Sequence, residues 1–167
     1  MIKAINIKNR NDAEQELIRL QKKKYPALDI RFENAHLLDL NTLIQKSIFV
    51  KNDLFANAEM LWEIMQPVGT KGSHNSHGLT PKEILDVLNS LVDPYYVYKS
   101  ETPNRYVIVS LIIRESGEPF VVIIEVGANL GFGEENNINK MITMYPKSKI
   151  DKTIIGLKPG FLLYSKY

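Results

Sequence analysis

The side chains best suited to chemistry lie in the second half of this 167-residue chain. His77 stands in a loop rich in Gly, Ser and Asn, and an imidazole titrates close enough to neutrality to act as a general acid or base. The basic segment 138–147 and the final segment 161–167 carry hydroxyl, amide and ammonium groups. The candidate catalytic residues are His77, Thr143, Tyr145, Tyr164 and Ser165, and the candidate phosphate-binding residues are Asn139, Lys140, Lys147 and Lys166.

These groups match what RNA cleavage needs when no metal ion takes part. That reaction requires a base for the 2′-hydroxyl, an acid for the leaving 5′-oxygen and positive charge around the phosphorane. His77, the tyrosines and the lysines could supply all three. In the final strand, Tyr164 and Lys166 share one face and Ser165 points to the other.

Residues 137–145 could form a strand or a helix, and Ile138, Ile142 and Met144 favour a strand with a bulge. Asn139, Thr143 and Tyr145 alternate along it and are expected to share a face, with Lys140 and Lys147 nearby. Asn, Thr and Tyr are also ordinary outward-facing strand residues, so both interpretations stay open for each of them.

The sequence predicts no metal and no cofactor. There is no cysteine, and His74 and His77 have no carboxylate near them at a spacing typical of a zinc site. The glycine-rich segment 127–133 lacks the Lys-Ser/Thr ending of a phosphate loop and follows a hairpin strand instead of opening a βαβ unit.

One helix and several strands must position these groups. Thr80 is a predicted N-cap, Pro81 takes the first helical position, and Glu83 completes a capping box for a helix over 80–92. Strands are expected at 95–99, 106–113, 120–126, 137–145 and 161–167, whereas 150–155 is open between strand and helix.

The N-terminal part has helical apolar spacing over most of its length. A short alternating strand at 2–7 precedes predicted helices at 12–24, 35–50 and 53–66. We predict an α+β fold in which an antiparallel sheet packs against a helix, preceded by a mostly helical N-terminal region. The predicted division is residues 1–72 for that region and residues 73–167 for a ribonuclease-like α+β domain.

Charge is unevenly distributed. Residues 101–137 carry a net charge of −4 and residues 138–167 a net charge of +5, so the basic end could attract a polyanion. On charge alone, a solvated lysine surface that only aids solubility is an equally good interpretation. No apolar run approaches the roughly 20 residues that span a bilayer, and no signal-peptide core is present, so we expect a cytoplasmic protein with no membrane partner.

Several features occur in a recognisable order: His77 before a capped helix, the segment 91–94 leading to 96–100, the paired strands 107–113 and 120–125, and the segments 138–145 and 161–165. In this order, residues 76–167 resemble the nuclease-like C-terminal domain of phage MuF-type head-morphogenesis proteins, within the Barnase–EndoU–colicin–RelE-like superfamily. The resemblance implies a helix packed on an antiparallel sheet and a metal-independent ribonuclease or toxin activity. It implies an acid/base role for His77, phosphate or proton contacts for Thr143 and Tyr145, and a role for Tyr164 or Ser165.

The chain departs from that pattern in two ways. Arg105 and Arg114 fall in the acidic segment, so no arginine is expected in the site, and the N-terminal helices have no counterpart. The expected function is RNA cleavage by 2′-hydroxyl transesterification, in a toxin that is phage-delivered or prophage-encoded, with a cognate inhibitor or immunity protein as partner. The alternative is a non-catalytic RNA- or protein-binding module of the same fold, such as a phage structural or interaction protein.

Overall fold

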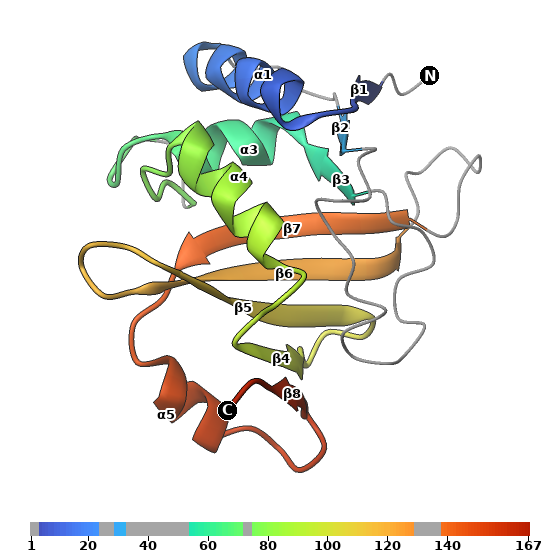
Figure 1. Ribbon diagram of the computed structural model, residues 1–167, viewed down its shortest axis with the longest axis vertical. Coiled ribbons are helices and arrows are strands. Elements are labelled where there is room, and N and C mark those ends of the chain that lie inside the picture. The colour runs from blue at the N-terminus through green and yellow to red at the C-terminus, as the bar shows by residue number, and fades with distance from the viewer. Residues whose placement is uncertain (1–3, 24–28, 33–53, 72–74, 129–137) are drawn as a thin grey trace.

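One sheet of eight strands runs through the protein (Figure 1). The computed structural model describes residues 4–23, 29–32, 54–71, 75–128 and 138–167. The strands are β1 (Ala4–Ile7), β2 (Asp29–Phe32), β3 (Leu54–Asn57), β4 (Tyr96–Lys99), β5 (Arg105–Ile113), β6 (Pro119–Ala128), β7 (Ile138–Pro146) and β8 (Leu162–Ser165). The helices are α1 (Arg10–Lys22), α3 (Ala58–Met65), α4 (Pro81–Ser90) and α5 (Ile150–Ile155).

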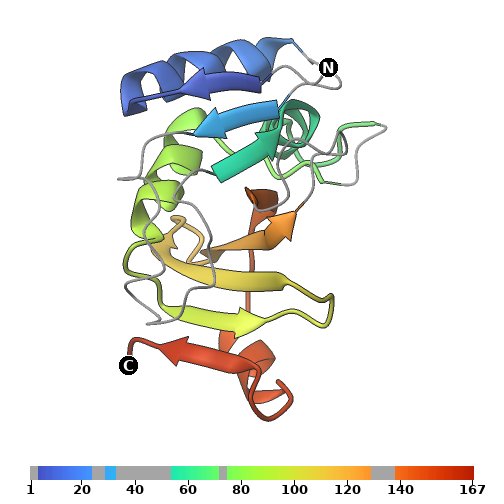
Figure 2. The same cartoon turned by 90° about the vertical axis from the view of Figure 1, so that its right-hand side faces the viewer.

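The strand order is β1-β2-β3-β7-β6-β5-β4-β8, which Figure 2 shows as a ladder from β1 at the top to β8 at the bottom. The pairs β1–β2 and β3–β7 are parallel, and the other five pairs are antiparallel. The predicted α+β class, with a largely antiparallel sheet packed against helices, is confirmed.

Helix α4 forms where its sequence predicts. The Thr80 hydroxyl accepts a hydrogen bond from the Glu83 backbone N–H at 3.1 Å, and the Glu83 carboxylate accepts one from the Thr80 N–H at 3.0 Å. Pro81 occupies the first turn. The capping box satisfies backbone amides that a helix start leaves without intrahelical partners. Ile84 and Leu88 are fully buried and point the apolar stripe of α4 at the sheet.

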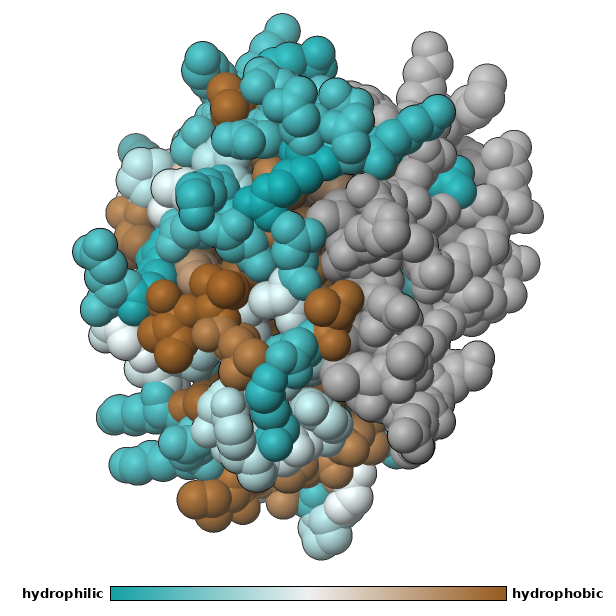
Figure 3. All heavy atoms as spheres, viewed as in Figure 1, coloured by the Kyte–Doolittle hydropathy of each residue, from teal (hydrophilic) through white to brown (hydrophobic). Residues whose placement is uncertain are grey.

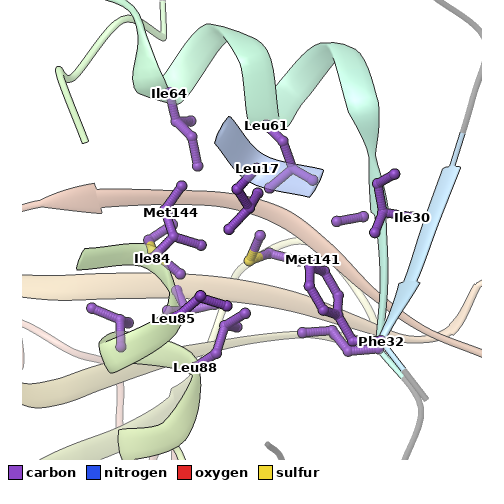
Figure 4. Packing of buried hydrophobic residues seen from close by; sticks show 14 of the residues in the cluster. Leu17, Ile30, Phe32, Leu61, Ile64, Ile84, Leu85, Leu88, Met141 and Met144 are labelled. Atoms are coloured by element: carbon purple, nitrogen blue, oxygen red, sulfur yellow. The ribbon is translucent and has the colours of Figure 1, made fainter. Parts of the chain in front are cut away.

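The main core lies between the sheet and helices α1, α3 and α4, on what we call the helix face. Figure 4 shows Leu17 of α1, Leu61 of α3 and Leu85 of α4 gathered over Met141 and Met144 of β7. All five side chains are at most 1 % exposed. One continuous core therefore joins the N-terminal elements to the C-terminal strands. On the outside, the surface over α1 is mostly hydrophilic, and a hydrophobic patch lies lower on the same side (Figure 3).

A smaller apolar cluster covers the other side of the sheet, which we call the second face. Tyr98, Val107, Val109 and Val121 form its centre. Helix α5 packs there through two isoleucines, Ile150 and Ile154.

Some predicted elements differ from the structure. The range 53–66, predicted as one helix, begins with β3 and becomes helical only at Ala58. The side chain of Asn57 caps α3 by accepting hydrogen bonds from the Glu59 and Met60 amides. Residues 150–155, left open between strand and helix, form α5. The helix predicted at 35–50 lies outside the described residues, and the division at residues 72 and 73 stays a prediction.

Candidate functional site

The chain before α4 is attached to the end of α3, and this attachment places His77. The Gly78 N–H donates to the Gln66 carbonyl at 2.7 Å, and the Leu79 N–H donates to the Ile64 carbonyl at 3.0 Å. Gly78 has a φ of +64°, a conformation that glycine adopts without steric cost. Because α3 also packs beside β7, the loop arrives close to the end of that strand.

His77 meets Tyr145 of β7. Their ring centroids are 5.6 Å apart and the ring planes are inclined by 34°. Tyr145 pairs with Val121 of β6 and packs with the cluster on the second face. Two candidate residues separated by most of the C-terminal sequence are therefore neighbours in space.

The two side chains titrate in opposite directions from their usual values. Burial lowers the pKa of His77 below its ordinary 6.5, and the positive charge of Arg114 lowers it further. Burial raises the pKa of Tyr145 above its ordinary 10.0. At neutral pH the site therefore presents a neutral imidazole, able to accept a proton, beside a protonated phenol, able to donate one.

Tyr98 of β4 adds a second phenol that the sequence analysis did not single out. Its side chain is 6 % exposed, and burial together with the nearby Tyr145 raises its pKa to about 12. The only local signal was its place in an alternating strand, which a core tyrosine shares. Only its position on the same face as Tyr145 connects it to the site.

A bulge in β7 changes which of its side chains share a face. The register with β6 shifts between Ile123 and Ile124, so that Thr143 pairs with Ile123 and Met141 with Ile124. The expectation that Asn139 shares a face with Thr143 and Tyr145 is therefore wrong, because one extra residue inverts the alternation. Asn139 is fully buried and pairs with Val126, which packs on the core of the helix face.

Lys140 takes the place on the second face that Asn139 was expected to hold. It pairs with Glu125 of β6, which in turn pairs with Arg105 of β5. The Arg105 Nε lies 3.1 Å from the Glu125 carboxylate. Charged groups therefore line one end of the strip on which Thr143 and Tyr145 lie. The Thr143 hydroxyl is buried and has no hydrogen-bond partner among the described residues.

The strand β8 is too far from His77 for its residues to join this cluster. Three strands, β6, β5 and β4, lie between β7 and β8, and four strand spacings amount to about 19 Å. Tyr164 pairs with Val97 and packs on the helix face, whereas Ser165 pairs with Tyr96 on the second face. Lys166 lies just beyond β8 and forms an ion pair with Asp93. Tyr164, Ser165 and Lys166 thus form a separate group at the far edge of the sheet.

An arginine does reach the site, contrary to the expectation from the acidic segment. The Arg114 guanidinium donates from Nη2 to the His77 carbonyl at 3.3 Å and to the Gly78 carbonyl at 3.2 Å. It also forms an ion pair with Glu83. A groove of about 670 Å³ lies beside it, lined in part by Thr80, Glu83 and Phe120.

The phage-family part of the resemblance is confirmed. Residues 69–164 match the family described as the phage MuF C-terminal domain, which is more than half of the chain. The chain belongs to this family. Neither curated proteins nor solved structures gave a match.

The matched range of the MuF C-terminal domain begins in the loop before α4 and ends within β8. It includes His77, Arg114 and Tyr145, whereas Ser165 and Lys166 lie beyond it. Within this MuF C-terminal domain, Lys147 follows Tyr145 by two residues, and its N–H donates to the Pro119 carbonyl at 2.9 Å.

Within the described part of the MuF C-terminal domain and its N-terminal extension, no group of three or more His, Cys, Asp or Glu side chains could hold a metal ion. In the same residues, no helix has both the length and the apolar character needed to cross a bilayer.

Proposed function

We propose that this MuF C-terminal domain cleaves RNA without a metal ion, by transesterification at the 2′-hydroxyl. One observation carries the proposal: a histidine with a lowered pKa lies against a tyrosine with a raised pKa. Pairs of groups whose surroundings move their pKa values apart are typical of acid/base catalysis.

In the proposed reaction, His77 accepts the proton of the 2′-hydroxyl, and the 2′-oxygen attacks the phosphorus. The bond from phosphorus to the 5′-oxygen breaks, and Tyr145 donates its phenolic proton to that oxygen. The products are a 2′,3′-cyclic phosphate and a free 5′-hydroxyl, and a proton passes from His77 back to Tyr145 before the next turnover. Lys140 and Lys147 place positive charge near the phosphorane.

The biological setting is also part of the proposal. Membership of a phage family supports a phage or prophage origin. A ribonuclease in that setting acts as a toxin in the cytoplasm, under the control of a cognate inhibitor or immunity protein. The relation to the Barnase–EndoU–colicin–RelE-like superfamily belongs to the same proposal.

RNA cleavage in excess EDTA tests the activity. We expect the protein to convert a short single-stranded RNA into fragments ending in 2′,3′-cyclic phosphate, detectable by mass spectrometry. Tyr145→Phe is expected to lower the rate about 10²-fold or more, because the leaving oxygen loses its acid. Tyr164→Phe is the matched control, since Tyr164 lies on the far strand and on the opposite face. Intact RNA under all conditions would remove the enzyme hypothesis, and loss of activity only in Tyr164→Phe would move the centre to β8.

The pH dependence provides a second test. His77 must be neutral to act as a base, and its pKa is lowered from 6.5, so kcat/KM should fall only as the pH drops below about 6.5. The phenols ionise above pH 10, so the rate should stay level between pH 7 and pH 9. A profile measured in EDTA at constant ionic strength checks this, and an acid limb centred above pH 7 would contradict a neutral imidazole base.

The rival function is a non-catalytic phage-associated module that binds RNA or a protein. Its support is the family match together with Lys147, Lys149 and Lys152, which have no ion pair among the described residues. Salt-dependent RNA binding without cleavage would favour it, with a slope of about −0.7 per neutralised phosphate in a plot of log K against log salt.

A further inference from the structure

Arg114 links two segments that lie far apart in the sequence. It follows β5 at the start of the turn into β6, whereas His77 and Gly78 belong to the loop before α4. Its guanidinium donates to the backbone carbonyls of His77 and Gly78. It also donates twice to the Glu83 carboxylate, at 3.0 and 3.2 Å. Each partner is thus held by the same planar group.

We propose that Arg114 is a positioning residue that fixes the His77 loop against the sheet and so holds the imidazole beside Tyr145. Its effect on catalysis rests on the proposed function, but its effect on the position of the ring does not.

Three features of the geometry support this role. First, the Arg114 side chain is only 23 % exposed, so its bonds are sheltered from water. Second, its guanidinium carbon lies 5.5 Å from the centroid of the Phe120 ring at the start of β6, which restricts where the fork can point. Third, Glu83 is itself fixed by the capping box with Thr80. Phe120 and Glu83 therefore both restrict the guanidinium that donates to the His77 carbonyl.

The chemistry of the fork explains why an arginine stands at this position. A guanidinium presents five N–H donors in one plane and can serve a carboxylate and two carbonyls together. An ammonium can reach the carboxylate but has no planar fork to hold both carbonyls in place. Burial alone would raise the pKa of Glu83, yet hydrogen bonds from Arg114 and Thr80 bring it below its usual value, so the carboxylate stays charged.

The experiment compares Arg114→Met and Arg114→Lys with the unmodified protein by two readouts. NMR follows the titration of the His77 imidazole and the nuclear Overhauser contact between the His77 and Tyr145 rings. The RNA cleavage assay supplies kcat and KM separately. For Arg114→Met we expect a higher His77 pKa, because a nearby positive charge is lost and the ring becomes more solvated. We also expect a weaker ring contact and about a 10-fold or greater fall in kcat with little change in KM.

Arg114→Lys separates charge from position and also guards against loss of folding in Arg114→Met. The ammonium keeps the positive charge and the ion pair to Glu83, so the fold should survive and the His77 pKa should rise less. The ring contact and kcat should still fall, because the fork to the carbonyls is gone.

Arg10→Gln is the matched control. Arg10 forms an ion pair with Asp86, one turn along α4 from Glu83, and makes no hydrogen bond or ion pair with the His77 loop among the described residues. It should leave both readouts unchanged. An unaltered His77 pKa and ring contact in both Arg114 variants would overturn the positioning role. If the Arg114 variants show these NMR changes but the unmodified protein cleaves no RNA, the positioning role stands and the proposed function is removed.

Discussion

His77→Gln is expected to lower the rate of RNA cleavage by about 10²- to 10⁴-fold. The amide of Gln has a size similar to that of an imidazole but cannot accept a proton near neutral pH. The 2′-hydroxyl would then lose the group that removes its proton, while Tyr145 and the nearby lysines remain. The acid limb of the pH profile should disappear in the same variant, because that limb reports the protonation of His77 itself.

The measurement is initial velocity on a short RNA in EDTA, with thermal unfolding recorded for each variant. Asn75→Ala is the matched control, since Asn75 lies on the same loop and its amide donates to Glu63 of α3. We expect near-normal rates for it. Equal loss in both variants would indicate a disturbed loop and not a missing base.

Leu17→Ala is expected to reduce the free energy of unfolding by about 2–5 kcal/mol. Leu17 is 1 % exposed on α1 and packs in the same core as Leu61 and Met141, so truncation leaves a cavity shared by both parts of the chain. Because sheet and core run from β1 to β8, we expect the signals of both parts to shift together in one transition.

Urea unfolding followed by circular dichroism and by the fluorescence of Trp62 in α3 checks this expectation. Gln15→Ala, at an exposed position on the same helix, should change the free energy by less than about 0.5 kcal/mol. Two separate transitions, with only the first shifted by Leu17→Ala, would instead support independent units divided near residues 72 and 73.

Some elements follow from local sequence, whereas others depend on pairing between distant segments. Helix α4 was predictable because Thr80, Pro81 and Glu83 form its start within four residues and its apolar spacing is regular. The hairpin of β5 and β6 was predictable for the same reason, since two apolar runs flank one turn. By contrast, Leu54–Asn57 has apolar content that fits a helix, and only its pairing with β2 and β7 makes it a strand.

The sequence alone determined the α+β class, the capped helix and the choice of His77 as a candidate acid or base. These follow from side-chain chemistry and from neighbours along the chain. The tertiary structure alone decided that Tyr145 lies beside His77 and that Tyr98 lies near Tyr145. It also decided that Lys140 replaces Asn139 on the face of these tyrosines, and that Arg114 contacts the His77 loop. Finally, it placed Tyr164 and Ser165 at the far edge. The reason is physical: a one-residue bulge inverts the alternation of a strand, and strand order depends on pairing between distant segments, neither of which local spacing fixes.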